Sequence, residues 1–355
     1  MEEVSKMTGA NQNMWRSLAM SFRIELTFHA ANNEGAGGTN VMEPRRITVG
    51  DKEYEGISGE IIRRHILENF VKLCQQNGIP LHDRCKGLVP DRGRDALISW
   101  AQSQHIQKLQ PENHYPNATA QLIKNCALCD VGGYLIALER GDPVQGVLKR
   151  DSCFEVGWLI SEHPAIVDYT QHSAYTTQID EEGKLQHNLF VQNMRVGIYG
   201  GVLRIDLDRI GRNDWWWLNP NGFKEYALSP QDRLKRAYLL LEAIKQWLLS
   251  PTFAKQTAWL QHQSGLLEGS IVLSKDGSAP FVSPIKFEVE IDENYRIKKA
   301  GIKRNENYKN VLQDIVNQIP DHYKKYDFKN PKELIETIDK IKKEELRCPN
   351  EVTEQ

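Results

Sequence analysis

Alternating apolar and polar residues mark the first regular element of the chain. Between Phe22 and His29, every second residue is phenylalanine, isoleucine or leucine, and polar residues stand between them. This is the period of a strand with one buried face. We therefore predict a half-buried strand whose four apolar side chains share the inner face. The glycine-rich residues 32–40 that follow are predicted to form an irregular loop.

Two segments repeat apolar residues at the spacing of an α-helix. In the first, Ser58 is a suitable N-cap, and apolar residues recur at helical spacing up to Cys74. In the second, Ser229-Pro-Gln-Asp232 places a proline at the first helical position and an acidic residue in the first turn. We predict a long amphipathic helix from there to Leu249.

Further strands and helices are weaker predictions from the same periods. Strands are expected around residues 153–159, 195–207 and 287–291, where apolar and polar residues alternate. The tail after Asn305 carries two amphipathic helix patterns, near Val311 and Leu334.

Two polar stretches interrupt this pattern. Residues 77–125 contain several prolines and glycines, so we expect an irregular insertion rather than core. Residues 159–192 are polar, and Asp180-Glu-Glu-Gly183 suits the tip of an extended hairpin. A protruding arm is therefore expected there.

Composition places the chain among folded proteins and says little about its partners. Hydrophobic residues make up 40% of the 355 residues and charged residues 26%, which is ordinary globular usage. The net charge of −2 does not indicate a nucleic-acid partner, so only the distribution of positive charge could. Basic clusters occur at Arg45-Arg46, Arg63-Arg64, Lys149-Arg150, Arg204–Arg212 and Arg233–Arg236.

The N-terminus and the cysteines bear on location. The first residues lack the apolar stretch of a secretion signal, and no segment approaches the ~20 apolar residues of a membrane-spanning helix. We expect a cytoplasmic protein with no membrane partner. In that reducing compartment the six cysteines are not a disulfide framework, so clusters among them indicate metal or thiol chemistry.

The sharpest chemical pattern is His82-Asp-Arg-Cys85 together with Cys126-Ala-Leu-Cys129. Two such pairs supply the four ligands of a tetrahedral zinc site, and four protein ligands would make that zinc structural. The alternative is that Cys126 and Cys129 pack in a core as small apolar residues while His82 and Cys85 are exposed. The sequence favours neither interpretation, and Cys74 is a substitute ligand. No other cofactor is required.

A helix start beside paired arginines is a candidate phosphate site. Ser58 and Gly59 open the first predicted helix, whose free N–H groups favour anions, and Arg63 and Arg64 follow closely. The Arg45-Arg46 pair lies next to the preceding glycine-rich loop. The alternative is an ordinary helix cap with a solvated arginine pair.

Other patterns are weaker. Trp215-Trp-Trp217 could stack bases, but three adjacent tryptophans cannot share one face, so part of this run belongs to a core or an interface. Asp206 and Asp208 share a strand face, and His163 and His172 lie on the predicted arm. No catalytic motif accompanies them, so the sequence gives no positive case for an enzyme.

The order of these segments resembles one protein family. It is similar to the DevR-like branch of the Cas-seven family, the backbone subunits of type I CRISPR complexes, of the type I-B or I-A kind. The residues that carry the likeness are the strand Phe22–His29, the loop with Arg45-Arg46, Gly56-Ile-Ser-Gly-Glu60, Asn125–Tyr134, Lys149–Gly157, Asn193–Gly201 and Gly265–Gly269. The resemblance covers roughly residues 21–274.

The resemblance implies an α+β fold shaped like a hand. A single palm domain over residues 1–355 would have an RRM-like ferredoxin fold, with a helical insertion at about 77–125, a β-hairpin thumb at about 159–192 and a helical tail at about 305–355. Copies would stack head to tail along a CRISPR RNA, each thumb pressing on the next copy's guide so that one base in six is flipped out. The implied partners are CRISPR RNA, target DNA paired with the guide, further copies and other Cascade subunits.

The resemblance also implies RNA contacts and no catalytic residue. The implied contacts are Asn40, Arg45 and Arg46 in the family's RNA-contacting loop, Ser58, Gly59, Arg63 and Arg64 in its phosphate-holding helix, and Lys149, Arg150 and Arg195 in further matching segments. No RNP-type aromatic motif is visible, so RNA binding is expected to depend on backbone and shape.

Two alternatives stay open. The related subunit of type III complexes cleaves target RNA with a loop aspartate, for which Asp180, Asp206 and Asp208 are the candidates. The family's autoregulator label indicates instead a stand-alone regulator that binds duplex DNA, although no helix-turn-helix signal is present.

Overall fold

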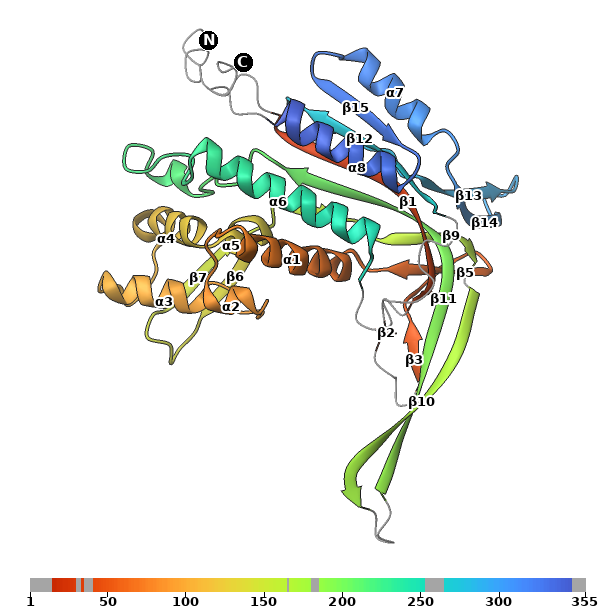
Figure 1. Ribbon diagram of the computed structural model, residues 1–355, viewed down its shortest axis with the longest axis horizontal. Helices are drawn as coiled ribbons and strands as arrows, with labels where there is room; N and C mark the ends of the chain where they lie inside the picture. The colour runs from red at the N-terminus through yellow and green to blue at the C-terminus, as the bar shows by residue number, and fades with distance from the viewer. Residues whose placement is uncertain are drawn as a thin grey trace.

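A computed structural model describes residues 15–29, 33–34, 41–164, 166–179, 185–252 and 265–346. Asn40 lies outside the described residues, as does the predicted hairpin tip at residues 180–183, which includes Asp180. Over the described part the protein is a mixed α+β fold, in which helices cover a large, mostly antiparallel sheet and a long two-stranded arm projects from it (Figure 1).

Strands from both halves of the chain build the main sheet. They are β1 (Ser17–His29), β2 (Asn33–Glu34), β3 (Val41–Pro44), β4 (Arg46–Val49), β5 (Lys52–Ile57), β8 (Phe154–Val156), β9 (Leu159–Pro164), β10 (Ile166–Ile179), β11 (Leu185–Asp206), β12 (Leu267–Ser274) and β15 (Tyr323–Phe328). The continuous order is β15-β12-β1-β11-β9-β5-β4. Two hairpins stand apart from this sheet, one formed by β6 (Tyr134–Leu138) with β7 (Gly146–Arg150) and one by β13 (Ile285–Ile291) with β14 (Ile297–Arg304).

The helices lie in three parts of the chain, residues 59–132, 230–249 and 308–340. They are α1 (Gly59–Gln76), α2 (Asp83–Lys86), α3 (Arg94–Ser103), α4 (Pro111–Asn125), α5 (Ala127–Gly132), α6 (Pro230–Leu249), α7 (Tyr308–Gln318) and α8 (Pro331–Lys340), with short turns η2 (Trp216–Leu218) and η3 (Ile341–Glu345). In Figure 1, α1 and α6 lie side by side, and α2 to α5 gather at one end of the molecule. None of the described helices combines the length and apolar character needed to cross a bilayer.

The main core lies between β1 and the helices α1 and α6. Met20, Phe22 and Ile24 of β1 are almost fully buried and belong to the same apolar cluster as Phe70 of α1 and Trp247 of α6. Neighbouring residues along β12 point to opposite faces, so Val272 instead packs with Leu312 and Val316 of α7 in a second, smaller cluster. The sheet edge near β15 is therefore covered on both sides.

The first strand differs from its prediction in two respects. It begins at Ser17, and its second face is also buried, because Arg23 is 3% exposed and forms ion pairs with Glu162 of β9 and Glu268 of β12. A charged side chain can be buried when it is paired in this way. The alternation predicted the strand and the apolar face correctly, but it could not show that ion pairs close the other face.

Both predicted long helices are confirmed with their caps. The Ser58 hydroxyl accepts a hydrogen bond from the Glu60 N–H at the start of α1, and the Ser229 hydroxyl accepts one from the Asp232 N–H at the start of α6. Helix α6 begins at Pro230 and ends at Leu249, as predicted from the sequence.

The residue pattern of the insertion predicted an irregular segment outside the core, and both of these expectations are wrong, whereas the resemblance implied a helical insertion. Residues 77–125 contain α2, α3 and α4, and Leu97 and Leu122 are buried in the main cluster. The prolines misled the prediction because Pro111 occupies the start of α4, where proline is tolerated, and the helix also accommodates Pro116. The tail likewise contains an unpredicted strand, β15, between its two helices.

The arm is formed by β10 and the first part of β11. These strands pair antiparallel from Ile166 with Val196 to Ile179 with Leu185, and together they extend well beyond the sheet (Figure 1). Strand β9 leads into the arm and also pairs with β5. The residue range predicted for the hairpin, 159–192, contains β9, β10 and the start of β11.

Candidate nucleic-acid interface and metal centre

The start of α1 packs tightly against the segment that leads into the arm. A Cβ atom at Gly59 would lie 1.9 Å from the Val156 carbonyl oxygen, so no larger residue fits there without a shift of the backbone. The amide groups of this first turn are partly satisfied, because the Ser58 hydroxyl accepts from Glu60 N–H at 3.3 Å and the Ser58 carbonyl accepts from Ile61 N–H at 3.2 Å. This site therefore offers fewer free amides to a phosphate than the sequence indicated.

The arginines of α1 remain accessible. Arg64 is exposed, and its Nε lies 3.3 Å from Glu68 Oε1, while the partly exposed Arg63 contacts Glu60 at 2.7 Å. Both are surface ion pairs within one helix, which contribute little to stability and exchange readily for a stronger anion. The two guanidinium groups are thus available to a polyanion.

The second arginine pair flanks an exposed tryptophan. The Arg45 guanidinium lies 4.8 Å from the centre of the Trp158 ring, and Arg46 forms an ion pair with Glu53. Trp158 is 40% exposed although it is large and aromatic, and its ring covers Gly56, where a Cβ atom would lie 2.8 Å away. An arginine stacked on an exposed aromatic ring is a surface that bases and phosphates can both contact.

Trp158 was not among the residues singled out from the sequence. No sequence pattern marks it, because its place beside Arg45 is set by the pairing of β9, which begins directly after Trp158, with β5. The structure therefore brings Arg45, Trp158 and the helix start together, with Arg63 and Arg64 following along α1. Lys149 lies on β7 instead, where it is exposed and 3.9 Å from Asp151.

Two of the predicted RNA contacts belong to the interior. The side chain of Arg150 is fully buried and donates to Asp130 at 2.7 Å and to Asp214 at 2.8 Å. The side chain of Arg195 is also fully buried, and its Nε lies 2.7 Å from Glu55 Oε1. Guanidinium groups enclosed in this way cannot reach a phosphate in this fold, so we remove both residues from the interface.

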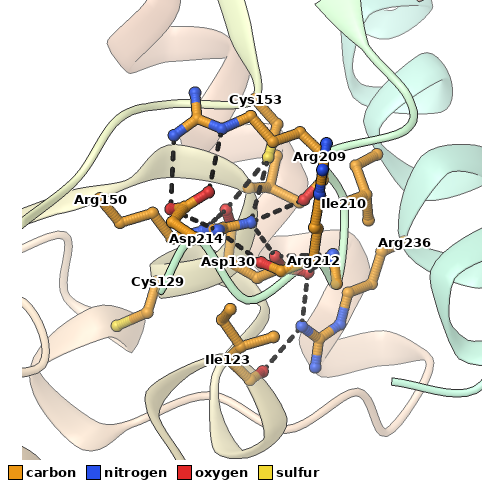
Figure 2. A network of polar contacts seen from close by, with 12 residues as sticks. Ile123, Cys129, Asp130, Arg150, Cys153, Arg209, Ile210, Arg212, Asp214 and Arg236 are labelled. Carbon is orange, nitrogen blue, oxygen red and sulfur yellow. Dashed lines mark hydrogen bonds and ion pairs between the residues drawn. The ribbon is translucent and has the colours of Figure 1, made fainter. Parts of the chain in front are cut away.

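Arg150 is part of a buried network centred on Asp130 (Figure 2). Asp130 Oδ1 accepts from Arg150, its Oδ2 accepts from Arg236 at 2.7 Å, and the Gly211 N–H donates to the same carboxylate at 2.9 Å. These contacts join α5 to β7, to α6 and to the loop after β11. The network therefore stabilises the packing of these elements and is not a binding site.

Arg195 belongs to a second buried cluster on the sheet. The Tyr199 hydroxyl donates to Glu55 and lies 2.9 Å from His29 Nε2. Burial raises the pKa of Glu55 despite the nearby Arg195. Burial, together with the positive charge of Arg195, lowers the pKa of His29 to about 3, so this histidine is neutral at physiological pH.

The four residues of the predicted zinc pattern lie together. The ligand atoms of His82, Cys85, Cys126 and Cys129 are all within 4.8 Å of one another, and the three cysteines are buried. Cys85 and Cys126 lie at the two ends of the helical insertion, so the fold brings together residues that are far apart in the sequence. Cys74 is buried nearby but is not part of this group.

The sequence model of the family described as CRISPR-associated negative auto-regulator DevR/Csa2 matches residues 20–296. The chain belongs to the DevR/Csa2 family. The resemblance stated from the sequence is thereby confirmed, and the match includes α1, the arm and the four residues of the metal cluster.

One relative of this DevR/Csa2 chain is the CRISPR-associated protein Cas7/Cst2/DevR of Methanocaldococcus jannaschii. The two are 24% identical over 214 residues, which cover 55% of this chain and 63% of the relative. The DevR/Csa2 chain thus spans less than two thirds of that relative's length.

Two solved structures are also similar to this DevR/Csa2 chain. A chain of a CRISPR RNA-guided surveillance complex, pre-nicking, is 13% identical with a TM-score of 0.36, over 73% of this chain and 79% of that one. A chain of a CRISPR RNA-guided surveillance complex is 12% identical with a TM-score of 0.39, over 90% and 98% of the two chains. Scores this low do not decide the fold.

The remaining candidates in the DevR/Csa2 chain have structural contacts. Asp208 accepts from the Tyr226 hydroxyl at 2.6 Å, and Asp206 accepts from the Arg209 N–H at 3.2 Å. Trp215 packs edge-on against Tyr115 at 5.1 Å, while Trp217 is 57% exposed. Only part of the tryptophan run is therefore free to contact a partner.

Proposed function

We propose that this protein is a non-catalytic, guide-RNA-binding backbone subunit of a CRISPR surveillance complex of the Cascade type. The observation that carries the proposal is that Arg45 and the exposed Trp158 lie beside the segment that packs on the start of α1, and that accessible Arg63 and Arg64 follow one turn along this helix, in a member of a CRISPR-associated family. Cations contact the phosphates of a single strand, and an aromatic ring can stack on its bases. Base pairing by the guide, not the protein, would supply sequence specificity.

The hand shape forms part of this proposal. The antiparallel sheet with α1 and α6 on one face would be the RRM-like palm, and the β10–β11 arm would be the thumb. In such an arrangement the thumb of one copy reaches the guide held by the next. RNA would then follow the helix start and the Arg45 loop, because these lie where the arm joins the sheet.

An exposed apolar strand supports assembly into copies or with other subunits. Phe287, Val289 and Ile291 of β13 alternate along one strand and are each more than half exposed. The partner strand β14 adds Ile297, which is 66% exposed. Apolar residues gathered on a projecting hairpin are typical of a protein interface.

The absence of catalysis is also part of the proposal. Three aspartates were considered as catalytic residues for RNA cleavage. Two of them, Asp206 and Asp208, make hydrogen bonds that hold the loop after β11. Burial raises the pKa of Asp206, as expected for a carboxylate inside a fold. Cleavage of target RNA that is lost on substitution of Asp180 would overturn this part of the proposal.

A second candidate follows from the family's description as a negative auto-regulator. In that role the protein would bind duplex DNA of its own promoter without partners. The two functions predict different ligands, since a backbone subunit retains single-stranded guide RNA and a regulator shifts a specific duplex. A filter-binding comparison of guide RNA with promoter DNA separates them.

The test is retention of guide RNA by an assembled complex. We would co-express the protein with the other subunits encoded beside it and compare wild type with the double variant Arg63→Glu, Arg64→Glu. Reversing two phosphate-contacting charges is expected to lower the RNA yield per protein by at least about 10-fold, because each lost phosphate contact lowers the affinity for RNA. The affinity should also depend less steeply on salt concentration.

The matched control reverses two cations on a distant helix. Lys332→Glu, Lys340→Glu on α8 makes the same change of charge, and both lysines have a carboxylate one turn away, as the arginines do. This control should retain RNA at the wild-type level. Full RNA retention by a folded Arg63, Arg64 variant would contradict the proposed interface.

A further inference from the structure

We propose that His82, Cys85, Cys126 and Cys129 bind one structural zinc ion that fastens the helical insertion to the rest of the fold. The pattern alone left this open, because the cysteines could have packed apart as small apolar residues. The structure instead brings one nitrogen and three sulfur atoms within 4.8 Å of one another. This proposal does not depend on whether the protein binds RNA.

Two of the distances between the ligand atoms match those of a zinc tetrahedron. Zinc–sulfur bonds of about 2.3 Å at tetrahedral angles place two sulfurs about 3.8 Å apart, and a zinc–nitrogen bond of about 2.05 Å places sulfur and nitrogen about 3.6 Å apart. Here Cys85 Sγ and Cys129 Sγ are 3.7 Å apart, and Cys129 Sγ and His82 Nδ1 are 3.6 Å apart. Cys126 Sγ lies within 4.8 Å of the ligand atoms of His82, Cys85 and Cys129.

A backbone N–H lies where it can stabilise the charge of one zinc-bound thiolate. The Cys129 N–H points to Cys126 Sγ at 3.4 Å, which stabilises negative charge on that sulfur. Three thiolates and a divalent ion would carry a net charge of −1, and Arg92, whose guanidinium donates to the Gly132 carbonyl of α5 at 3.5 Å, supplies a positive charge close to this helix. Outer groups of this kind are what a buried metal site needs.

The backbone around the cluster is held in place. The Ala127 N–H donates to the Pro80 carbonyl at 2.9 Å, which aligns the two ligand-bearing segments. Gly93 has φ of +77°, and a Cβ atom there would lie 3.1 Å from Cys129 Sγ. A side chain at position 93 would therefore press on a ligand.

The position of the cluster gives the ion its role. Cys85 lies on α2 before the main helices of the insertion, and Cys126 follows the last residue of α4, so one ion closes the loop that contains α3 and α4. On the other side of α5, Asp130 holds Arg150 and Arg236, and Figure 2 shows the Cys129 side chain directed away from that network. Helix α5 is thus fixed from both sides. Four protein ligands leave no position for a reacting water, so the ion is not catalytic.

The first experiment measures metal in the purified full-length protein. Elemental analysis is expected to find about one zinc per chain. Cobalt added to protein stripped of zinc should give the visible absorption of tetrahedral cobalt with thiolate ligands. Zinc removal by a chelator is expected to lower the Tm by more than about 5 °C, because the binding energy of a structural ion contributes to folding.

Variants distinguish the four ligands from neighbouring thiols. Cys126→Ser and His82→Ala should lose at least about four fifths of the zinc, whereas His82→Cys, which keeps four ligands, should retain it. Cys74→Ser is the matched control, because Cys74 is a buried thiol near Cys126 that is outside the cluster. Its zinc content should stay at the wild-type level.

Several results would overturn the proposal. They are less than about 0.1 zinc per chain with no cobalt spectrum in wild type, iron in place of zinc, a Cys85–Cys129 disulfide in protein purified under reducing conditions, or equal zinc loss in Cys74→Ser. If the ligand variants fail to fold, the wild-type metal content and cobalt spectrum decide the question. A negative result here leaves the RNA-binding proposal standing, since that is tested by RNA retention.

Discussion

Neutralising Asp130 should destabilise the protein more than any single surface change. Its carboxylate is fully buried and is shared by two guanidinium groups, those of Arg150 and Arg236, whose side chains are 0% and 3% exposed. Asp130→Asn keeps the shape of the side chain but removes the charge, so two buried cations lose their common anion.

The contacts that remain set the size of the effect. Arg150 keeps Asp214 at 2.8 Å, and Arg236 keeps the Ile123 carbonyl at 2.8 Å, so neither guanidinium is left without a partner. Removing one member of a buried ion pair typically costs about 3–5 kcal/mol, and these residual contacts favour the lower end. For a chain of this length, about 3 kcal/mol corresponds to a fall in Tm of about 4 °C.

Thermal unfolding followed by circular dichroism measures this directly. The control is Asp95→Asn, because Asp95 also pairs with an arginine, Arg84 at 2.5 Å, but both side chains are more than 40% exposed. The control should lower stability by no more than about 1 kcal/mol. Equal Tm values for the two variants would refute the view that the Asp130 network holds α5 in place.

Two further predictions concern the interface and the sheet. Trp158→Ala should weaken single-stranded RNA binding by about 10-fold in a fluorescence anisotropy titration, because base stacking on an aromatic ring is worth about 1–3 kcal/mol. The control is Trp217→Ala, which removes another exposed tryptophan and should leave the affinity unchanged. Equal effects of the two variants would remove Trp158 from the interface. Because the pKa of His29 is about 3 in the fold and about 6.5 in the unfolded chain, its contribution to stability is present above pH 6.5 and is lost as pH falls toward 3. Urea unfolding should show wild type losing about 2 kcal/mol more than His29→Gln between pH 7.5 and pH 5, with the exposed His163→Gln behaving as wild type; identical pH profiles for wild type and His29→Gln would show that His29 is not buried as described.

Local patterns predicted the regular elements well. The alternation from Phe22, the Ser58 and Ser229 caps and the spacing of apolar residues located β1, α1 and α6, because caps and periodicity act within a few residues of the chain. The same logic failed for residues 77–125, where prolines were taken as breakers although Pro111 begins a helix.

The predicted interface arginines divide into exposed and buried ones, and no sequence pattern could show which were buried. Arg63 and Arg150 look alike in the sequence, each adjacent to another basic residue, yet one lies on a helix surface and the other is enclosed by Asp130 and Asp214. The partners of Arg150 come from α5 and from the loop after β11. Such long-range contacts are set by the tertiary fold.

The metal cluster was predictable in composition but not in arrangement. Two ligand pairs about forty residues apart named the four residues, and only the fold shows that their ligand atoms converge. Trp158, by contrast, was not identified from the sequence at all, because its surface position beside Arg45 depends on the path of β9 past β5.

The most direct test of the central claim is the identity of the RNA that the assembled wild-type protein carries. We would purify the complex formed with its neighbouring subunits and sequence all bound nucleic acid. The proposal predicts uniform CRISPR RNAs in an assembly that contains several copies of this chain. A protein that stays free of RNA in the presence of those subunits, and instead retains one duplex DNA sequence, would contradict it.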